Sequence, residues 1–215
     1  MVNSKGTLLA VCRLHALTPD ANAFGLTAID KRPVAGPVKV TKYGLYADVQ
    51  VDRKNHGGRD KALYAYAQHD AEYWQEILGY PVPPGLFGEN LRIAGLDVNQ
   101  ALIGEQWRIG AEVLVEVTMP RTPCATFQRR LDEPQWVKRF SQAGRVGPYL
   151  RVLETGSIEA GDVVEVVHRP GHGVRIAEWF AHPTAELAQA LLADPDLDVA
   201  AAFEPYFEKV FRREA

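Results

Sequence analysis

The stretch that decides the fold runs Ala111-Glu-Val-Leu-Val-Glu-Val-Thr118 and continues Met119-Pro-Arg-Thr-Pro-Cys-Ala-Thr-Phe-Gln-Arg-Arg130. Its first half alternates apolar and polar residues, which is the pattern of a half-buried strand. Pro120 ends that strand because it has no N–H to donate to the ladder. Pro123 fixes a second turn, so the pattern predicts a short, stiff loop that presents Cys124.

Cationic residues surround this cysteine in the sequence, namely Arg121, Arg129 and Arg130. Positive charge stabilises the thiolate, which is both the nucleophile and the soft metal ligand. A cysteine at a strand end is otherwise a small packed hydrophobe. We interpret Cys124 as a functional thiol, and Cys12, inside an aliphatic strand, as a core residue.

Short predicted strands extend outward on both sides of this stretch. They cover residues 7–14, 38–42, 91–93, 106–109, 149–154 and 162–168. Glycine-bearing turns between many short strands favour a mixed barrel or sandwich over a parallel α/β sheet, so the fold class is mainly β. Residues 15–30 have the composition of a loop.

Two helices are predicted among these strands. The first begins after Asp60 as its N-cap, carries apolar residues from Leu63 to Ile77 and ends at Gly79. The second covers residues 133–142.

Three further helical patterns occupy residues 174–181, 184–193 and 198–213, with Thr184 and Asp196 or Asp198 as N-caps. They predict a small bundle that packs against the barrel or against a second subunit. We therefore divide the chain into a β-barrel domain, 1–168, and a three-helix domain, 169–215.

Composition narrows the classes of function. The chain has 215 residues, a formal net charge of −3 and a pI near 6.1, which argues against a duplex nucleic-acid binder. No run reaches the roughly 18 apolar residues of a membrane helix, and the N-terminus does not have the pattern of a signal peptide. Two cysteines are too few for a disulfide framework. We expect a cytoplasmic protein in a reducing compartment, with no nucleic acid or membrane as partner.

Three other patches could bind an anion or a polar ligand. In the first, His56, Gly57 and Gly58 precede the predicted helix start near Lys61, where backbone N–H groups could hold an anion; the alternative is a plain turn. In the second, Lys31 and Arg32 could grip a phosphate or carboxylate, or could simply be exposed cations. The third, Phe87-Gly88-Glu89-Asn90-Leu91, is either a structural turn or a binding turn.

Together these motifs resemble the MOSC domain family, in that family's order. The residues that carry the resemblance are 31–34, Tyr43–Asp52, His56–Tyr66, Phe87–Leu91, Ile103–Gly110 and Pro120–Cys124. The likeness is strongest to YiiM-type bacterial members, which add a three-helix domain after the barrel. One departure is Ala65, where a second basic residue or a histidine is expected.

This resemblance implies a barrel related to that of pyruvate kinase and a link to the molybdenum cofactor, a pterin dithiolene with a terminal phosphate. It implies that Cys124 ligates molybdenum or carries sulfur, and that the protein detoxifies N-hydroxylated bases such as 6-hydroxylaminopurine by reduction. The residues that would hold the anionic cofactor are Lys31, Arg32, His56, Gly57, Gly58, Lys61 and Arg121, and Glu89 and Asn90 would meet the pterin edge.

The leading hypothesis is thus a molybdenum-cofactor oxidoreductase acting on a small N-hydroxylated molecule. Its electrons would come from an electron-donor reductase, since the sequence has no flavin, haem or iron–sulfur motif. One alternative is a non-catalytic carrier of the cofactor or of a persulfide. Another is a hydrolase that uses Cys124 with His56. A homodimer is left open.

Overall fold

The computed structural model describes residues 3–52 and 57–214, and it confirms the mainly β fold class. The strands are β1 (Lys5–Leu14), β2 (Thr18–Pro19), β3 (Leu26–Thr27), β4 (Lys31–Pro33), β5 (Val38–Thr41), β6 (Gly44–Leu45), β7 (Leu63–Ala67), β8 (Leu91–Ala94), β9 (Gln106–Ile109), β10 (Val113–Pro120), β11 (Pro148–Glu154), β12 (Gly156–Ile158) and β13 (Val163–His168). The helices are α2 (Gln68–Leu78), α3 (Ala125–Leu131), α4 (Trp136–Ala143), α5 (Ile176–Ala181), α6 (Ala185–Leu192) and α7 (Glu204–Glu214), with short 3-10 turns at Arg59–Lys61 and Ala201–Phe203.

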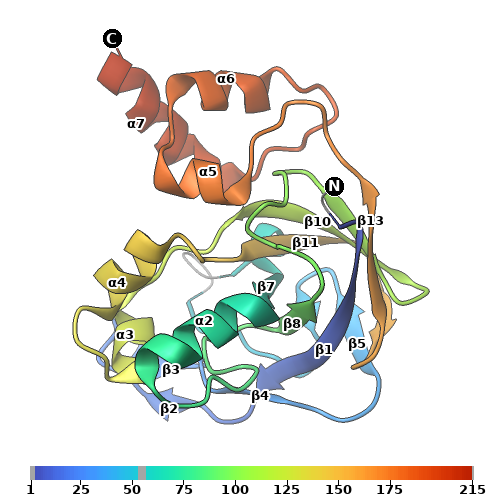
Figure 1. Cartoon of the computed structure of the whole chain (residues 1–215), viewed down its shortest axis with the longest axis vertical. Helices are drawn as coiled ribbons and strands as arrows, with labels where there is room; N and C mark the ends of the chain where they lie inside the picture. The colour runs from blue at the N-terminus through green and yellow to red at the C-terminus, as the bar shows by residue number, and fades with distance from the viewer. Residues whose placement is uncertain (1–2, 53–56, 215) are drawn as a thin grey trace.

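Seven strands close into a barrel (Figure 1). Their order is β13-β9-β10-β11-β7-β8-β1, and β1 pairs back to β13 with Lys5 opposite Glu165. Neighbouring strands are antiparallel, apart from the parallel pair β7–β8. The far end of β1 also receives β4, with Cys12 opposite Pro33, so β4 lies outside the closed ring but is fixed to it.

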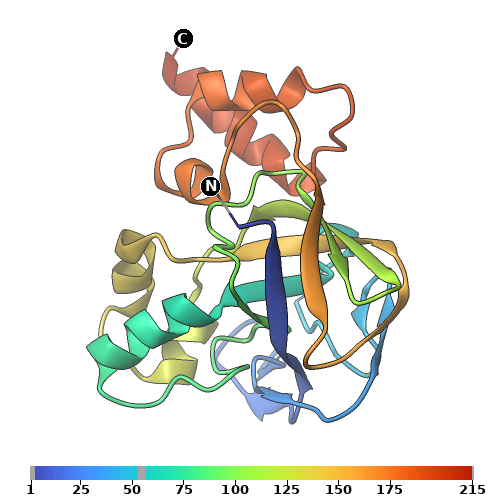
Figure 2. The same cartoon turned by 45° about the vertical axis from the view of Figure 1, so that its right-hand side comes forward.

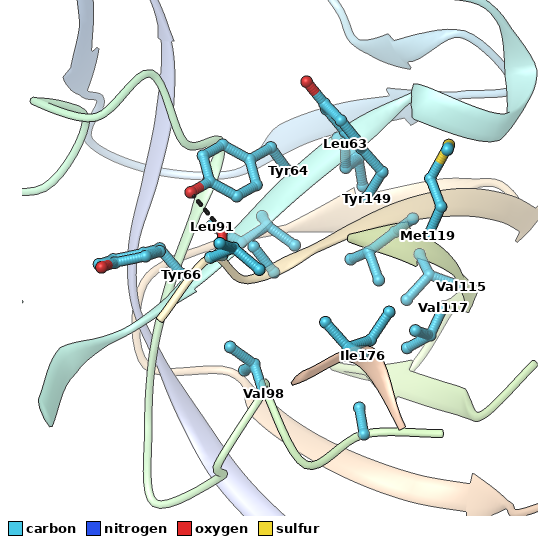
Figure 3. Packing of buried hydrophobic residues seen from close by; sticks show 14 of the residues in the cluster. Leu63, Tyr64, Tyr66, Leu91, Val98, Val115, Val117, Met119, Tyr149 and Ile176 are labelled. Atoms are coloured by element: carbon cyan, nitrogen blue, oxygen red, sulfur yellow. Dashed lines mark hydrogen bonds between the residues drawn. The ribbon is translucent and has the colours of Figure 1, made fainter. Parts of the chain in front are cut away.

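Strand β10 lies where it was predicted, but it is not half-buried as its alternation indicated, because seven of its eight residues are buried, including Glu116 and Thr118. It pairs with β9 on one side and β11 on the other. Its valines Val115 and Val117 belong to the buried core of the barrel, next to Ile176 from the C-terminal part (Figure 3). Pro120 is its last residue, opposite Pro148, as expected for a residue that cannot continue the ladder.

The prediction of a helix from Asp60 onward is wrong in its first half. Residues Leu63–Ala67 form strand β7, and α2 begins only at Gln68. All five residues of β7 are buried, so the strand lacks the alternation that distinguishes a half-buried strand from a helix. The predicted end at Gly79 is confirmed, because this residue takes φ 74° and donates its N–H to the Gln75 carbonyl.

The helix predicted over residues 133–142 is confirmed as α4, although it begins only at Trp136, whereas α3 was not predicted. The two helices are separated by Asp132 at φ 53° and Gln135 at φ 54°. The apolar faces of both helices, with Phe127, Trp136 and Phe140, join an aromatic cluster together with α2. Figures 1 and 2 show α2, α3 and α4 grouped beside the barrel.

The three C-terminal helices form a layer over one end of the barrel (Figure 2). Thr184 caps α6 as predicted, accepting the Leu187 N–H at 3.2 Å. Asp198 is not an N-cap, because its carboxylate accepts a hydrogen bond from Arg151 of β11 at 2.5 Å. The layer therefore packs against the barrel, and the division of the chain at residue 168 remains a prediction. No helix in the described ranges is long and apolar enough to cross a bilayer.

Candidate functional site

A cavity of about 540 Å³ lies beside the β2–β3 hairpin and the start of α3. This volume is within the range of small-molecule and cofactor sites. Five of the residues predicted to bind the cofactor or its metal line it together: Lys31, Lys61, Asn90, Arg121 and Cys124. They are separated by up to 93 positions in the chain, so the barrel brings them into one site.

Cys124 reaches the cavity from the end of the stretch that decides the fold. It follows β10 and occupies the N-cap position of α3 in an extended conformation, with φ −133°. The residue is half-buried, whereas Cys12 is fully buried in β1. Burial raises the pKa of the Cys12 thiol to about 12, which keeps that thiol protonated and confirms its role in the core.

Arg121 supplies a buried positive charge next to this cysteine. Its residue is only 5% exposed, and its guanidinium carbon lies 4.1 Å from the centroid of the Phe127 ring. Its Nη1 is buried and has no hydrogen-bond partner within the described part of the chain. A buried donor without a partner is costly, so a guanidinium in this state favours an acceptor supplied from the cavity.

Arg129 and Arg130 have a different role from the one expected. Arg129 donates from Nε and Nη2 to the two carboxylate oxygens of Asp20, each at 2.7 Å. Arg130 donates to Asp30 at 2.6 Å. These two aspartates compensate much of the positive charge that the sequence places after the cysteine.

Lys31 and Arg32 are separated by the geometry of their strand. Successive side chains of β4 point to opposite faces, so Lys31 turns into the cavity and Arg32 turns out. The Lys31 ammonium pairs with Asp48, and its side chain is 10% exposed. The Arg32 side chain is 58% exposed and lies 3.4 Å from Asp30. Of this pair of cations, only Lys31 is placed to meet a ligand in the cavity.

Lys61 enters from the 3-10 turn before β7, with Nζ 5.8 Å from the centroid of the Tyr149 ring. Burial lowers the pKa of Lys61, while Asp52 and Asp60 oppose that shift. The predicted helix N-terminus is absent here, because residues 59–61 make a single short turn. Gly57 and Gly58 do not line the cavity, and the Gly58 N–H donates to the Gln50 side chain at 3.1 Å. His56 lies outside the described residues.

Glu89 is a structural residue. It is fully buried, accepts the N–H groups of Gly85 at 2.8 Å and Phe87 at 3.1 Å, and forms an ion pair with Arg92. The structural alternative thus explains the position of this carboxylate better than contact with a pterin.

Asn90 lines the cavity floor, but its amide is already engaged. Its Oδ1 accepts the Tyr64 N–H at 3.1 Å, and its Nδ2 donates to the Cys12 carbonyl at 3.1 Å and to Asp48 at 2.8 Å. Asp48 also accepts the Leu14 N–H at 2.8 Å. Asn90 therefore holds Asp48, and through it Lys31, in place.

The model of the MOSC domain matches residues 52–165, which is more than half of the chain. The chain belongs to the MOSC domain family. Among curated proteins it is 35% identical over 150 residues to the uncharacterized protein YflK of Bacillus subtilis, covering 70% of this chain and 67% of YflK. It is 34% identical over 147 residues to Protein YiiM of Escherichia coli, covering 66% of this chain and 65% of YiiM.

A fungal relative of this MOSC protein is much longer. The match to a protein named Reductase from Gibberella moniliformis is 33% identical over 187 residues and covers 81% of this chain but only 33% of the reductase. Among solved structures, YiiM from Geobacillus stearothermophilus superposes with a TM-score of 0.77 at 30% identity, covering 95% of this chain and 98% of that one. The YiiM-type likeness and the barrel fold are thereby confirmed.

One wall of the cavity was not predicted from the sequence, where residues 15–30 had only the composition of a loop. Residues 21–29, in and around the β2–β3 hairpin, line it with Phe24, Leu26 and Ile29, among others. The hairpin strands have only two residues each, too few to show alternation. The only available signal was turn chemistry, with Pro19 and Asp20 before the turn and Gly25 at φ 70° within it.

The site has no ready cluster of protein ligands for a metal. In residues 3–52 and 57–214, no group of three or more His, Cys, Asp or Glu side chains could hold a metal ion.

Proposed function

We propose that this protein binds the molybdenum cofactor in the cavity and uses it to reduce N-hydroxylated molecules such as 6-hydroxylaminopurine. MOSC domains are associated with this cofactor, and one relative is named Reductase. The observation that carries the proposal is the buried Arg121 guanidinium, which lines the same cavity as Cys124 and has a donor without a partner in the described residues.

The residues present fit an anionic guest of this kind. A pterin dithiolene with a terminal phosphate offers acceptor oxygens and negative charge. Arg121 would donate to an oxyanion, and Lys31 and Lys61 would add positive charge from two other sides of the cavity. Cys124 would supply a thiolate, the soft ligand that a molybdenum centre accepts.

The reaction itself sets what the chain must provide. Reduction of a hydroxylamine to an amine takes two electrons and two protons, breaks the N–O bond and releases water. The bound cofactor would supply the two-electron chemistry, and a separate electron-donor protein would replenish the electrons. Lys61 Nζ is the cavity group best suited to deliver a proton, because burial lowers its pKa and makes the ammonium a stronger acid.

The experiment compares the molybdenum and pterin contents of purified wild type, Cys124→Ser, Lys31→Met and Arg32→Met. We expect loss of molybdenum from the first two variants and wild-type content in Arg32→Met, because Arg32 faces away from the cavity. Equal molybdenum in wild type and Cys124→Ser would remove the ligand role.

The same purified proteins test the two alternative functions, a carrier and a hydrolase. Holo-protein that keeps the cofactor but does not reduce 6-hydroxylaminopurine with a supplied electron donor would identify a carrier. The hydrolase alternative remains a prediction, because His56 lies outside the described residues. Trapping of an acylated Cys124 by mass spectrometry would support it.

A further inference from the structure

We propose that the β2–β3 hairpin is the substrate-side wall of the cavity, where Phe24 selects a planar aromatic substrate and Asp20 fixes the wall relative to Cys124. This inference rests on the proposed function and assigns the substrate-contacting residues of that site. The hairpin lies outside residues 52–165, the part matched by the MOSC model, so its role in the site is argued from this chain's own contacts.

The cavity has charged side chains in its interior and apolar side chains at its opening, which is the opposite of the usual arrangement in folded proteins. Arg121 is 5% exposed and the side chains of the Lys31–Asp48 ion pair are 10% and 7% exposed, so these charged groups lie deep, while large apolar side chains stand at the mouth. Arg129, whose side chain is 39% exposed, also lines the cavity but is paired with Asp20. Phe24 is 54% exposed, and Leu26 and Val49 are each 42% exposed. Folding normally hides such apolar side chains and leaves charges in water. A ligand that is charged at its inner end and apolar at its outer end would satisfy both.

Two ligands would together occupy the cavity, the cofactor at the charged inner end and the substrate at the apolar mouth. The deep cations suit the anionic groups of the cofactor, and they leave the apolar mouth without an occupant of its own character. A flat ring placed against Phe24 would cover the exposed apolar surface while its N–OH group points inward toward Cys124. Aromatic side chains recognise flat rings through stacked or edge-on contacts, which a puckered aliphatic ring makes less well.

The two ends of the hairpin segment are pinned to helix α3, the helix that begins directly after Cys124. At one end, Asp20 accepts from Arg129 at 2.7 Å twice and from the Thr126 hydroxyl at 2.8 Å. At the other end, Asp30 accepts from Arg130 at 2.6 Å. The side chains of both aspartates are 5% exposed, so water competes little for these contacts.

This double attachment has a positional consequence. Because consecutive arginines of α3 hold the segment before and after the hairpin, the wall cannot shift without moving the helix that starts at the thiol. The distance between the wall and the reacting centre is thus set by the Asp20 and Asp30 ion pairs. Asp20 is a positioning residue in this arrangement, and Phe24 is the residue that touches substrate.

The test of Phe24 uses the holo-protein and two substrates, planar 6-hydroxylaminopurine and the puckered N-cyclohexylhydroxylamine. We expect Phe24→Ala to raise the KM for 6-hydroxylaminopurine about five- to tenfold, with kcat within about twofold of wild type. We expect Phe24→Tyr, which keeps an aromatic ring, to have the wild-type KM. The control is Tyr46→Ala, since Tyr46 is 65% exposed but does not line the cavity. Equal effects on both substrates, or none on either, would overturn the proposal.

Binding of adenine, followed by saturation-transfer NMR, separates this inference from the proposed function. If wild-type holo-protein does not reduce 6-hydroxylaminopurine, the proposed function fails, and the wall is judged on adenine alone. Adenine binding that weakens in Phe24→Ala but not in Tyr46→Ala supports the wall. Absence of adenine binding to the wild type, or equal binding to all variants, overturns it.

The positioning role of Asp20 is tested by exchanging charges. We expect Asp20→Arg to raise KM for 6-hydroxylaminopurine, and the double variant Asp20→Arg with Arg129→Asp to restore it. Asp20→Asn is the milder companion in case the reversed charge impairs folding, and it should raise KM while molybdenum content stays at the wild-type level. Unchanged KM in Asp20→Asn, or a change in kcat alone, would refute the role.

Discussion

Replacing Arg121 by methionine should leave the stability of the cofactor-free protein nearly unchanged while abolishing cofactor binding. The side chain is 5% exposed and its Nη1 is buried without a partner in the described structure. An unmet buried donor costs about 1–3 kcal/mol. The contact of the guanidinium with the Phe127 ring, at 4.1 Å, contributes about 0.5–2 kcal/mol in the other direction. The side-chain hydrogen bond of Arg121 with Tyr149 contributes about 0.5–1.5 kcal/mol in the same direction as the ring contact.

These effects nearly cancel, and methionine keeps the apolar stem and can pack on the same rings, so we expect a change within about 1 kcal/mol. For a chain of this length, that corresponds to a shift in Tm of no more than about 2–4 °C. The assay is chemical and thermal unfolding of both proteins produced in cells that cannot make the cofactor. Molybdenum content is measured in parallel on proteins from cells that can.

The matched control is Arg32→Met, a substitution of the same type at an exposed position. We expect its unfolding free energy to stay within about 0.5 kcal/mol of wild type and its molybdenum content to be unchanged. The reasoning would be refuted if cofactor-free Arg121→Met were less stable than wild type by more than about 2 kcal/mol, or if it retained molybdenum. The first result would mean that Arg121 is satisfied without a ligand.

Three further predictions concern stability. Lys31→Met should destabilise the protein by about 3 kcal/mol, because it leaves the Asp48 carboxylate without its cation. Arg32→Met is the control and should not lower the free energy of unfolding, which urea unfolding measures for both variants. Gly79→Ala should cost about 1 kcal/mol in the same assay, since φ 74° is strained for alanine although its Cβ would meet no neighbour. Arg129 lowers the pKa of Asp20 from 3.8 to about 2. The contribution of this ion pair to the free energy of unfolding is therefore full above about pH 4 and is lost as the pH falls through about 2.

The pH prediction is checked by comparing unfolding midpoints of wild type and Asp20→Asn across this range. The gap between the two proteins should be constant from pH 7 to about pH 5 and should narrow below pH 4. A gap that widens on acidification would show that the predicted direction of the pH effect is wrong.

For Gly79→Ala, an unchanged midpoint would mean that the helix end relaxes away from the left-handed conformation. For Lys31→Met, equal midpoints would mean that Leu14 and Asn90 alone suffice to hold Asp48.

Part of the polar lining was predicted from residue type, since Lys31, Lys61, Asn90, Arg121 and Cys124 meet in the cavity, whereas Arg32, Gly57, Gly58 and Glu89 do not line it. Two prolines around Cys124 fixed a loop, and the alternation of β10 led into it. The opposite orientations of Lys31 and Arg32 were not predicted, because residues 31–33 were not recognised as a strand, in which neighbours face opposite ways. The role of Glu89 was left open, although its partner Arg92 lies only three residues downstream.

The rest of the site depends on contacts that a single sequence does not reveal. Strand β7 is buried on both faces, and its apolar run has no period that separates it from a helix. The hairpin wall is set by Asp20 and Asp30 meeting arginines about a hundred positions later. Such pairings are decided by the closed barrel, and the residues involved look like ordinary surface charges in the sequence.

The double pairing of β1 has a consequence for how the molecule is made. Its first half needs β13, which ends at His168, while its last half anchors β4, the strand that carries Lys31. Pairing between such distant segments is slow to form, because a long loop must close first. During synthesis, the edge of β1 that pairs with β13 therefore stays open until Val163–His168 is available. We expect a chain truncated upstream of β13 to keep this edge unpaired and to be prone to aggregation.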